Sequence, residues 1–223
     1  MDHQRLEAGL QALLGRHAAV VCRSTDGNVN TLAPIERLAV SRAVSVRQRE
    51  FAAGRAAARD AMQKLGRPAA SVPVQYDRSP RWPDDLVGSI AHSRTTCVAV
   101  VALKQHWLSV GVDVESDNDL PRELWNSIGL PDEIQRASEL PEAAQARWMM
   151  RIFSAKEAYY KWIYPQTQRM LGFHDVEIIM NSTLDSSEFL AYPLKEKNSA
   201  HSSSVLTGTL TIEHNTIISL VIK

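Results

Sequence analysis

The sequence predicts an α+β fold with antiparallel β-sheets. Two long segments, residues 45–66 and 142–164, carry apolar side chains at the spacing of an amphipathic helix. Short apolar segments rich in β-branched residues surround them, and four such segments follow one another near the end of the chain. Strands in direct succession indicate antiparallel pairing, and their mixture with long helices indicates the α+β class.

The first helix is expected just before Gly15. Four leucines recur there at helical spacing, and a glycine is a common residue at the end of a helix. Residues 18–22 are apolar and indicate a strand. The leucines are Leu6, Leu10, Leu13 and Leu14.

The second helix is predicted over residues 45–66. Ser45 and Gln48 have the spacing of a capping box, and Gly66 followed by Pro68 is a stop signal. Its buried stripe is predicted to contain Phe51, Ala58, Met62 and Leu65.

The middle of the chain is predicted to contain a loop and then strands. Residues 72–85 include three prolines and indicate the loop. The apolar run at 97–103 and the alternating segment at 108–116 are predicted to pair as antiparallel strands. The short connection at 104–107 is also the expected domain boundary.

The last helix is predicted over residues 142–164, where Pro165 would end it. Four strands are expected after this helix. Residues 197–204 are expected to form a loop, and residues 214–215 a tight turn. The predicted strands cover residues 175–180, 187–192, 204–212 and 216–222.

The composition excludes several classes of protein. The 223 residues are 44% hydrophobic, with 25 basic and 25 acidic side chains and a formal net charge of zero. This balance disfavours a disordered chain and a nucleic-acid coat protein. No apolar run approaches the ~18 residues of a membrane span, and the N-terminus does not have the pattern of a signal peptide. Cys22 and Cys97 are expected to be buried, reduced thiols of a cytoplasmic protein.

The zero net charge conceals an asymmetry along the chain. Residues 36–81 contain ten basic and four acidic side chains, whereas residues 84–145 contain four basic and eleven acidic ones. A basic first half suits phosphate groups, and an acidic middle suits a cation.

The acidic middle contains GVDVE at residues 111–115. Side chains at positions i and i+2 of a strand point the same way, so Asp113 and Glu115 share one face, roughly 7 Å apart. Two carboxylates placed in this way can bind one hard divalent cation. From spacing alone, however, the solvated face of an edge strand is the more common explanation.

The last helix contains FSAKEAYYK at residues 153–161. Glu157 and Lys161 stand one turn apart on one face, and Lys156 precedes Glu157. These residues form either an ordinary surface ion pair or part of a functional site. In the second case Glu157 is a metal ligand or general base, and the lysines bind phosphate.

Two further motifs carry groups that can bind phosphate. In GSIAHS, His92 and Ser93 stand at the end of a predicted strand. In GRAAAR, Arg55 and Arg59 share a helix face and could bind a phosphomonoester. An ordinary histidine and a solvated helix surface are the alternatives.

These motifs occur together, in this order, in one known family. The chain resembles the 4′-phosphopantetheinyl transferases of the monomeric two-subdomain type, in the group that includes enterobactin synthase component D. GVDVE followed about 40 residues later by FSAKExxxK is the most specific part of the resemblance. The matching pieces, between residues 54 and 173, are GRAAARDAM, DRSPRWPDDLVGSIAHS, GVDVE and FSAKEAYYKWIYPQTQRMLGF.

The resemblance implies a fold of two similar α/β subdomains related by a pseudo-twofold, with coenzyme A between them. Residues 1–107 would form the nucleotide and phosphate side, and residues 108–223 the subdomain with the metal and the catalytic helix. The implied enzyme uses Mg²⁺ to transfer the 4′-phosphopantetheine arm of coenzyme A to a serine of an apo carrier protein, and releases 3′,5′-ADP. The carrier would be a peptidyl, aryl or acyl carrier, in siderophore or other nonribosomal peptide synthesis. We expect a cytoplasmic monomer that does not bind nucleic acid.

The resemblance also assigns roles to residues of this chain. Asp113, Glu115 and Glu157 would hold the metal, and Glu157 would also take the proton of the carrier serine, directly or through water. Lys156 and Lys161 would stabilise the pyrophosphate, with Lys161 closest to the developing charge. The groups that would bind the phosphates and the nucleotide end are His92, Ser93, Arg55, Arg59 and Arg78.

Two departures from the family pattern affect these roles. Ala91 replaces a frequent serine or threonine, and Asp77 replaces a frequent glycine, which leaves the path of the loop around Arg78 open. Two other functions are also compatible with the motifs. One is a non-catalytic coenzyme A-binding module with the same fold, and the other is a metal-dependent phosphohydrolase. The aromatic residues Tyr159, Trp162 and Tyr164 are candidates for contact with the carrier protein.

Overall fold

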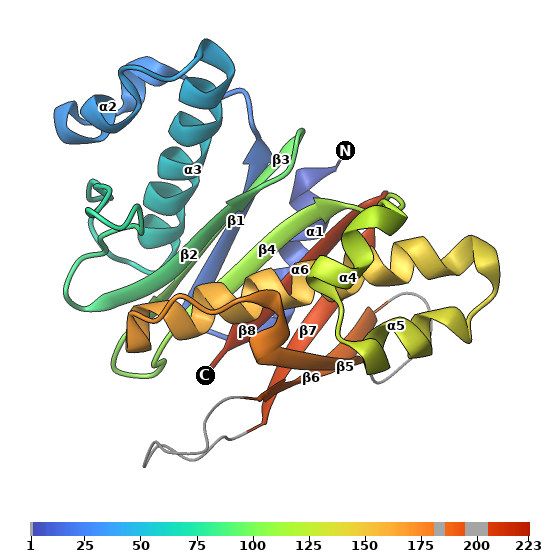
Figure 1. Cartoon of the computed structure of the whole chain (residues 1–223). Helices are drawn as coiled ribbons and strands as arrows, with labels where there is room; N and C mark the ends of the chain where they lie inside the picture. The colour runs from blue at the N-terminus through green and yellow to red at the C-terminus, as the bar shows by residue number, and fades with distance from the viewer. Residues whose placement is uncertain (1, 181–185, 195–204) are drawn as a thin grey trace. The chain divides into compact units, whose positions relative to one another are not determined.

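A computed structural model of the chain describes residues 2–180, 186–194 and 205–223 (Figure 1). The chain divides into two compact units. Unit 1 is Met1–Val114 with Ile222–Lys223, and unit 2 is Glu115–Val221. The boundary that we expect between residues 107 and 108 stays a prediction.

Helices and antiparallel strands occur in both units, which confirms the predicted α+β class. The helices are α1 (His3–Leu14), α2 (Pro34–Val40), α3 (Ser45–Lys64), α4 (Trp125–Ile128), α5 (Pro131–Ser138) and α6 (Glu142–Thr167), with 3₁₀ turns η1 (Val29–Thr31), η2 (Arg122–Leu124) and η3 (Phe173–Asp175). The strands are β1 (Ala18–Ser24), β2 (Leu86–His92), β3 (Thr96–Leu103), β4 (Val110–Ser116), β5 (Val176–Met180), β6 (Ser186–Pro193), β7 (Leu206–Glu213) and β8 (Thr216–Ile222). Within the part of the chain that the structure describes, every helix is too short or too polar to span a bilayer.

Unit 1 is built on a three-stranded antiparallel sheet in the order β1-β3-β2, and α3 packs against it (Figure 1). The packed face of α3 consists mainly of alanines, which let the helix backbone approach the sheet closely. Ala57, Ala58 and Ala61 are fully buried there against Val21 and Val101. The helix at the N-terminus ends as predicted, because Gly15 takes a left-handed φ of 66°.

The ends of α3 agree only in part with the sequence. Val44 occupies the N-cap position, and the side chain of Gln48 donates to the carbonyls of Val40 and Ala43, so the predicted capping box is wrong. The predicted stop is right. Gly66 has a φ of 70°, and its N–H donates to a carbonyl in the last turn of the helix.

The predicted pairing of residues 97–103 with residues 108–116 is wrong. β3 is the central strand of its sheet and is buried along all but its last residue. Its two edges pair with β1 and β2, so neither edge is available to residues 108–116. The segment at 108–116 forms β4 instead, in a five-stranded sheet with the order β4-β8-β7-β6-β5.

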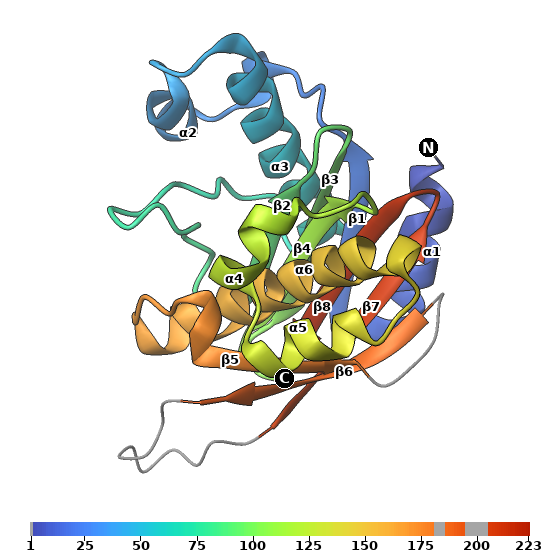
Figure 2. The same cartoon turned by 45° about the vertical axis from the view of Figure 1, so that its right-hand side comes forward.

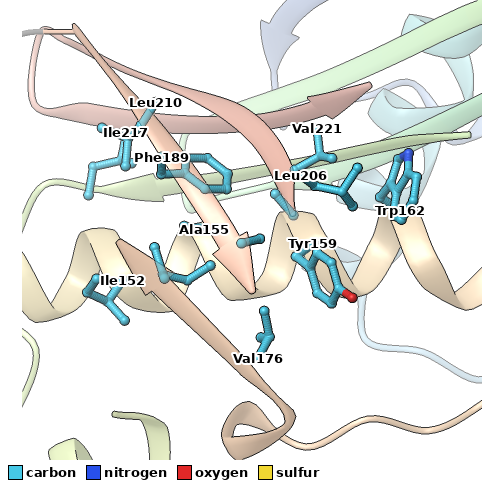
Figure 3. Close-up of a cluster of buried hydrophobic side chains, with 13 residues drawn as sticks. Ile152, Ala155, Tyr159, Trp162, Val176, Phe189, Leu206, Leu210, Ile217 and Val221 are labelled. Carbon is cyan, nitrogen blue, oxygen red and sulfur yellow. The ribbon is translucent and has the colours of Figure 1, made fainter. Parts of the chain in front are cut away.

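In unit 2, the long helix α6 lies across β5 to β8, and α5 runs beside α6 (Figure 2). The apolar face of α6 forms the main core of this unit (Figure 3). Tyr159 and Trp162 are only 3% and 6% exposed and point into this core. They therefore stabilise the unit, and their burial does not support the predicted contact with a carrier protein. The half-buried Tyr164 stays a candidate for that contact.

The C-terminal segments agree with the predictions at all but one described point. The four predicted strands are present as β5 to β8, and His214 and Asn215 form the tight turn with φ values of 48° and 63°. The helix does not end at Pro165 but continues to Thr167 and ends at Gln168, which has a left-handed φ of 54°. The predicted loop at residues 197–204 lies outside the described residues.

Gly208 supplies a test of packing in unit 2. It lies opposite Phe189 across β6 and β7, and a Cβ at Gly208 would stand 2.1 Å from the fully buried ring. Gly208→Ala should therefore lower the free energy of unfolding by about 1–3 kcal/mol, measured by urea titration. Gly9→Ala is the control, because Gly9 lies on the exposed face of α1 and nothing lies within 4 Å of the new Cβ. It should raise stability by up to ~1 kcal/mol. Equal effects of the two substitutions would contradict the packing described here.

Candidate functional site

Asp113 and Glu115 lie on β4, where successive side chains point to opposite faces of the strand. Val112 and Val114 are fully buried, Asp113 is 4% exposed and Glu115 is half-buried. The N–H of Val112 donates to the buried hydroxyl of Ser89 on β2, 3.1 Å away. The two carboxylates thus share one face of a firmly held strand, as the spacing predicts.

Glu157 and Lys161 lie on the outer face of α6. The apolar cluster takes the face that carries Ala155 and Tyr159, and each helical residue turns the side-chain direction by about 100°. Glu157 and Lys161 therefore point away from the core, and both are half-buried. This is the shared face that their spacing of four residues predicts.

The three carboxylates predicted to bind metal fit a magnesium ion by their chemistry. All donate hard oxygen atoms, which Mg²⁺ prefers. Among the described residues, however, no group of three histidine, cysteine, aspartate or glutamate side chains is placed to hold a metal ion. The structure supports a shared strand face for Asp113 and Glu115 on β4 and places Glu157 on the half-buried face of α6.

His92 forms a polar cluster with two residues from the first turns of α3. Nη1 of Arg47 contacts Nε2 of His92, and it lies 3.3 Å from Oε2 of Glu50. The same carboxylate oxygen is 3.9 Å from Nε2 of His92. Arg47 is not among the predicted site residues, although Arg47, Phe51 and Arg55 recur every four residues and must share a helix face.

Arg55 holds a positive charge inside unit 1. Its side chain is 6% exposed, its Nε donates to the carbonyl of Val72 at 2.7 Å, and its guanidinium lies 4.1 Å above the ring of Phe51. Burial lowers the pKa of Arg55 to about 10, so the group stays protonated at neutral pH.

Ser93 and Arg78 lie in turns. The hydroxyl of Ser93 accepts the N–H of Thr96 at 3.2 Å, and the N–H of Ser93 donates back to the carbonyl of Thr96. This exchange closes the turn between β2 and β3. Arg78 is exposed and has a left-handed φ of 71°. The carboxylate of Asp77 fixes that turn, because it accepts both the N–H and the hydroxyl of Ser79.

Lys156 does not share the outer face of Glu157. Its side chain is 1% exposed, and its ammonium lies 2.7 Å from Oε2 of Glu133. It also donates to the carbonyls of Ile128 at 3.0 Å and Phe173 at 2.8 Å. Burial lowers the pKa of Lys156, and the Glu133 carboxylate opposes that shift. The Lys156 ammonium has three N–H groups to donate, and three protein oxygens accept from it. This geometry therefore does not support the predicted contact of Lys156 with phosphate.

In unit 1, the guanidinium of Arg59 likewise donates to protein oxygens. Its Nη1 lies 3.0 Å and 3.2 Å from the two carboxylate oxygens of the fully buried Glu36. Its Nη2 donates to the carbonyl of Thr31 at 3.1 Å. Arg59 therefore neutralises a buried acid, and a direct role in binding a phosphomonoester is not supported.

Chemical modification tests the placement of Lys156. Acetic anhydride should acetylate the exposed Lys104 of the native protein quickly and leave Lys156 unmodified, because the Lys156 ammonium is enclosed by protein oxygens. Peptide mass spectrometry measures both sites, and denaturation should make Lys156 reactive. Equal acetylation of the two lysines in the native protein would show that Lys156 is accessible.

Comparison with known proteins identifies the family to which the chain belongs. Residues 35–102 match the model of the 4′-phosphopantetheinyl transferase N-terminal domain, and residues 109–214 match that of the 4′-phosphopantetheinyl transferase superfamily. The two matches together cover most of the chain.

Among the similar proteins is 4′-phosphopantetheinyl transferase PptT of Mycobacterium tuberculosis, 37% identical over 65% of this chain and 63% of its own length. Another is 4′-phosphopantetheinyl transferase Svp of Streptomyces mobaraensis, 34% identical over 74% of this chain and 67% of its own length. Enterobactin synthase component D of Escherichia coli K12 is 35% identical over 60% of this chain and 62% of its own length. The chain thus spans slightly less than two thirds of PptT and of enterobactin synthase component D. Two matching family models and these relatives agree with the order of motifs, and the chain belongs to the 4′-phosphopantetheinyl transferase superfamily.

Proposed function

We propose that the chain transfers the 4′-phosphopantetheine arm of coenzyme A to a serine of an apo carrier protein and releases 3′,5′-ADP. The observation that carries the proposal is the outward face of α6. There Glu157 and Lys161 offer a carboxylate and an ammonium one turn apart, in a chain whose relatives are named 4′-phosphopantetheinyl transferases. A base and a cation side by side suit the deprotonation of a hydroxyl next to a phosphate.

The reaction breaks the pyrophosphate of coenzyme A. The serine oxygen attacks the phosphorus that bears the pantetheine arm, and the bond from that phosphorus to the bridging oxygen of 3′,5′-ADP breaks. Glu157 takes the serine proton, directly or through water. Lys161 stabilises the negative charge that develops on the phosphate oxygens.

Asp113, Glu115 and Glu157 would hold a magnesium ion, which supplies neutralisation of phosphate charge when bound. The support for this assignment is the carboxylate chemistry of all three residues and the shared strand face of Asp113 and Glu115.

The nucleotide end of coenzyme A is proposed to bind on unit 1. Arg55 and His92 keep their predicted roles, and Arg47 joins them through its contact with His92. Arg78 and Ser93 remain candidates, because one is exposed and the other lies beside His92. Arg59 and Lys156 are left out, since their donors are directed at protein oxygens.

The pathway and setting are further proposals. Relatives named enterobactin synthase component D favour a carrier of siderophore or other nonribosomal peptide synthesis, whether peptidyl, aryl or acyl. A cytoplasmic monomer stays the prediction. Cys22 and Cys97 agree with a reducing compartment, because both are free and buried, and burial raises the pKa of each thiol to about 12.

A transfer assay with intact-mass detection tests the proposal. With Mg²⁺ and coenzyme A, the protein should add one phosphopantetheine mass to an apo carrier, and Asp113→Asn should lower the rate at least ~100-fold by removing a charged ligand. Circular dichroism should show an unchanged fold. The control is Asp119→Asn, which removes an exposed carboxylate 3.6 Å from Arg147 and should keep full activity.

Two results would contradict the proposed transfer, and a third would contradict only the proposed metal site. Coenzyme A binding without transfer to any carrier of a broad panel would favour a non-catalytic binding module. Release of free phosphopantetheine would favour a phosphohydrolase. Full activity of Asp113→Asn would remove Asp113 from the metal site.

A further inference from the structure

The two units contain, at corresponding places, an ion pair between a buried glutamate and a basic residue of the long helix. In each unit a short helix starts with a proline and has a glutamate as its third residue, Glu36 in α2 and Glu133 in α5. Both glutamates are 0% exposed. The basic partner follows 23 residues later on the long helix, Arg59 on α3 and Lys156 on α6. We call these the Glu36 pair and the Glu133 pair.

The remaining bonds of the two glutamates also correspond. Glu36 accepts the N–H of Ala33, directly before α2, at 2.9 Å and the N–H of Val72 at 2.7 Å. Glu133 accepts the N–H of Leu130, directly before α5, at 2.7 Å and the N–H of Ile178 at 2.7 Å. Each carboxylate thus joins the start of a short helix, a cation on a long helix and a later segment of its own unit.

The Glu133 pair connects the parts of unit 2 that surround α6. Through Lys156 the helix is tied to the last residue of α4 at Ile128, to η3 at Phe173 and to α5 at Glu133. Glu133 is also tied to β5, an edge strand of the sheet, because the N–H of Ile178 on β5 donates to its carboxylate. A buried charge tolerates little displacement from its partner, so these bonds fix α6 in rotation and along its axis.

We propose that Lys156 and Glu133 are positioning residues for the reaction, and that Lys156 does not bind coenzyme A. Glu157 directly follows Lys156, with its side chain turned by about 100° around the helix. Holding the Lys156 ammonium inside unit 2 therefore sets the direction of Glu157 and Lys161 on the outer face. This inference rests on the proposed function and adds two residues that act through others.

The alternative is that Lys156 binds the pyrophosphate directly, and steady-state kinetics separate the two. If Lys156 and Glu133 position α6, then Lys156→Met and Glu133→Gln should each lower kcat at least ~10-fold and leave KM for coenzyme A within about threefold. The double variant should be no slower than the worse single variant, because both residues form one unit. If Lys156 binds coenzyme A, Lys156→Met should raise KM, and Glu133→Gln should resemble the wild type.

Glu36→Gln is the matched control, because it breaks the same arrangement in unit 1. Glu36 is fully buried and adjoins α3, which carries Arg47 and Arg55. The variant should lose thermal stability like Glu133→Gln, yet keep kcat at saturating coenzyme A and raise KM instead. A fall in kcat equal to that of Glu133→Gln would show that lost stability alone explains both variants, and would overturn the proposal.

Separate control measurements distinguish a loss of folding from a loss of function. Circular dichroism and thermal unfolding report the fold of each variant. If Glu133→Gln does not fold, Glu133→Asp replaces it, because it keeps the charge and is one methylene shorter. It should again lower kcat at unchanged KM. A wild type that transfers nothing to any carrier would overturn the proposed function and this inference with it. An active wild type with full kcat in a folded Glu133 variant would overturn the inference alone.

Discussion

A buried carboxylate in each unit constrains which segments of this fold must stay together. Glu36 and Glu133 have no exposed surface, and each must replace lost water with a cation and backbone N–H groups. Removing one partner of such a pair typically costs about 3–5 kcal/mol, against a total stability of about 5–15 kcal/mol for a domain. The segments that supply the partners are therefore held together, and the long helices α3 and α6 are among them.

This constraint explains how one short motif serves structure and chemistry together. In FSAKEAYYK, Lys156 points inward to Glu133, whereas Glu157 and Lys161 lie on the half-buried outer face. The helical turn of about 100° per residue is enough to place neighbouring residues in different environments. Adjacent polar residues of a motif therefore need not act on the same ligand. Arg55 and Arg59 illustrate the same point on α3, since only Arg59 pairs with the buried glutamate.

Local patterns in the sequence predicted much of the fold and part of the candidate site. Helical spacing located α1, α3 and α6, and short apolar runs rich in β-branched residues located β5 to β8, because these patterns depend on nearby residues. The pairing of β3 with β1 and β2 could not be predicted in this way, since it joins segments far apart in the chain. For the site, spacing correctly indicated the shared face of Asp113 and Glu115 and that of Glu157 and Lys161.

The inward direction of Lys156 and Arg59 could not be predicted, because it depends on glutamates 23 residues earlier. The only local trace of the repeated arrangement is Pro-x-Glu, in Ala33–Glu36 and again in Leu130–Glu133. Such a pattern is too short to stand out from the surrounding sequence. Arg47 was missed for a different reason, since its contact with His92 joins the start of α3 to the end of β2.

Hydrogen exchange of two backbone amides tests the central claim most directly. The N–H groups of Val72 and Ile178 donate to Glu36 and Glu133, and neither bond belongs to a helix or to a strand ladder. If the buried carboxylates hold their units together, both amides should exchange only through global unfolding, as slowly as those of the central strand β3. Exchange at the rate of exposed loops would contradict the account, because it would show that the carboxylates do not hold these segments in place.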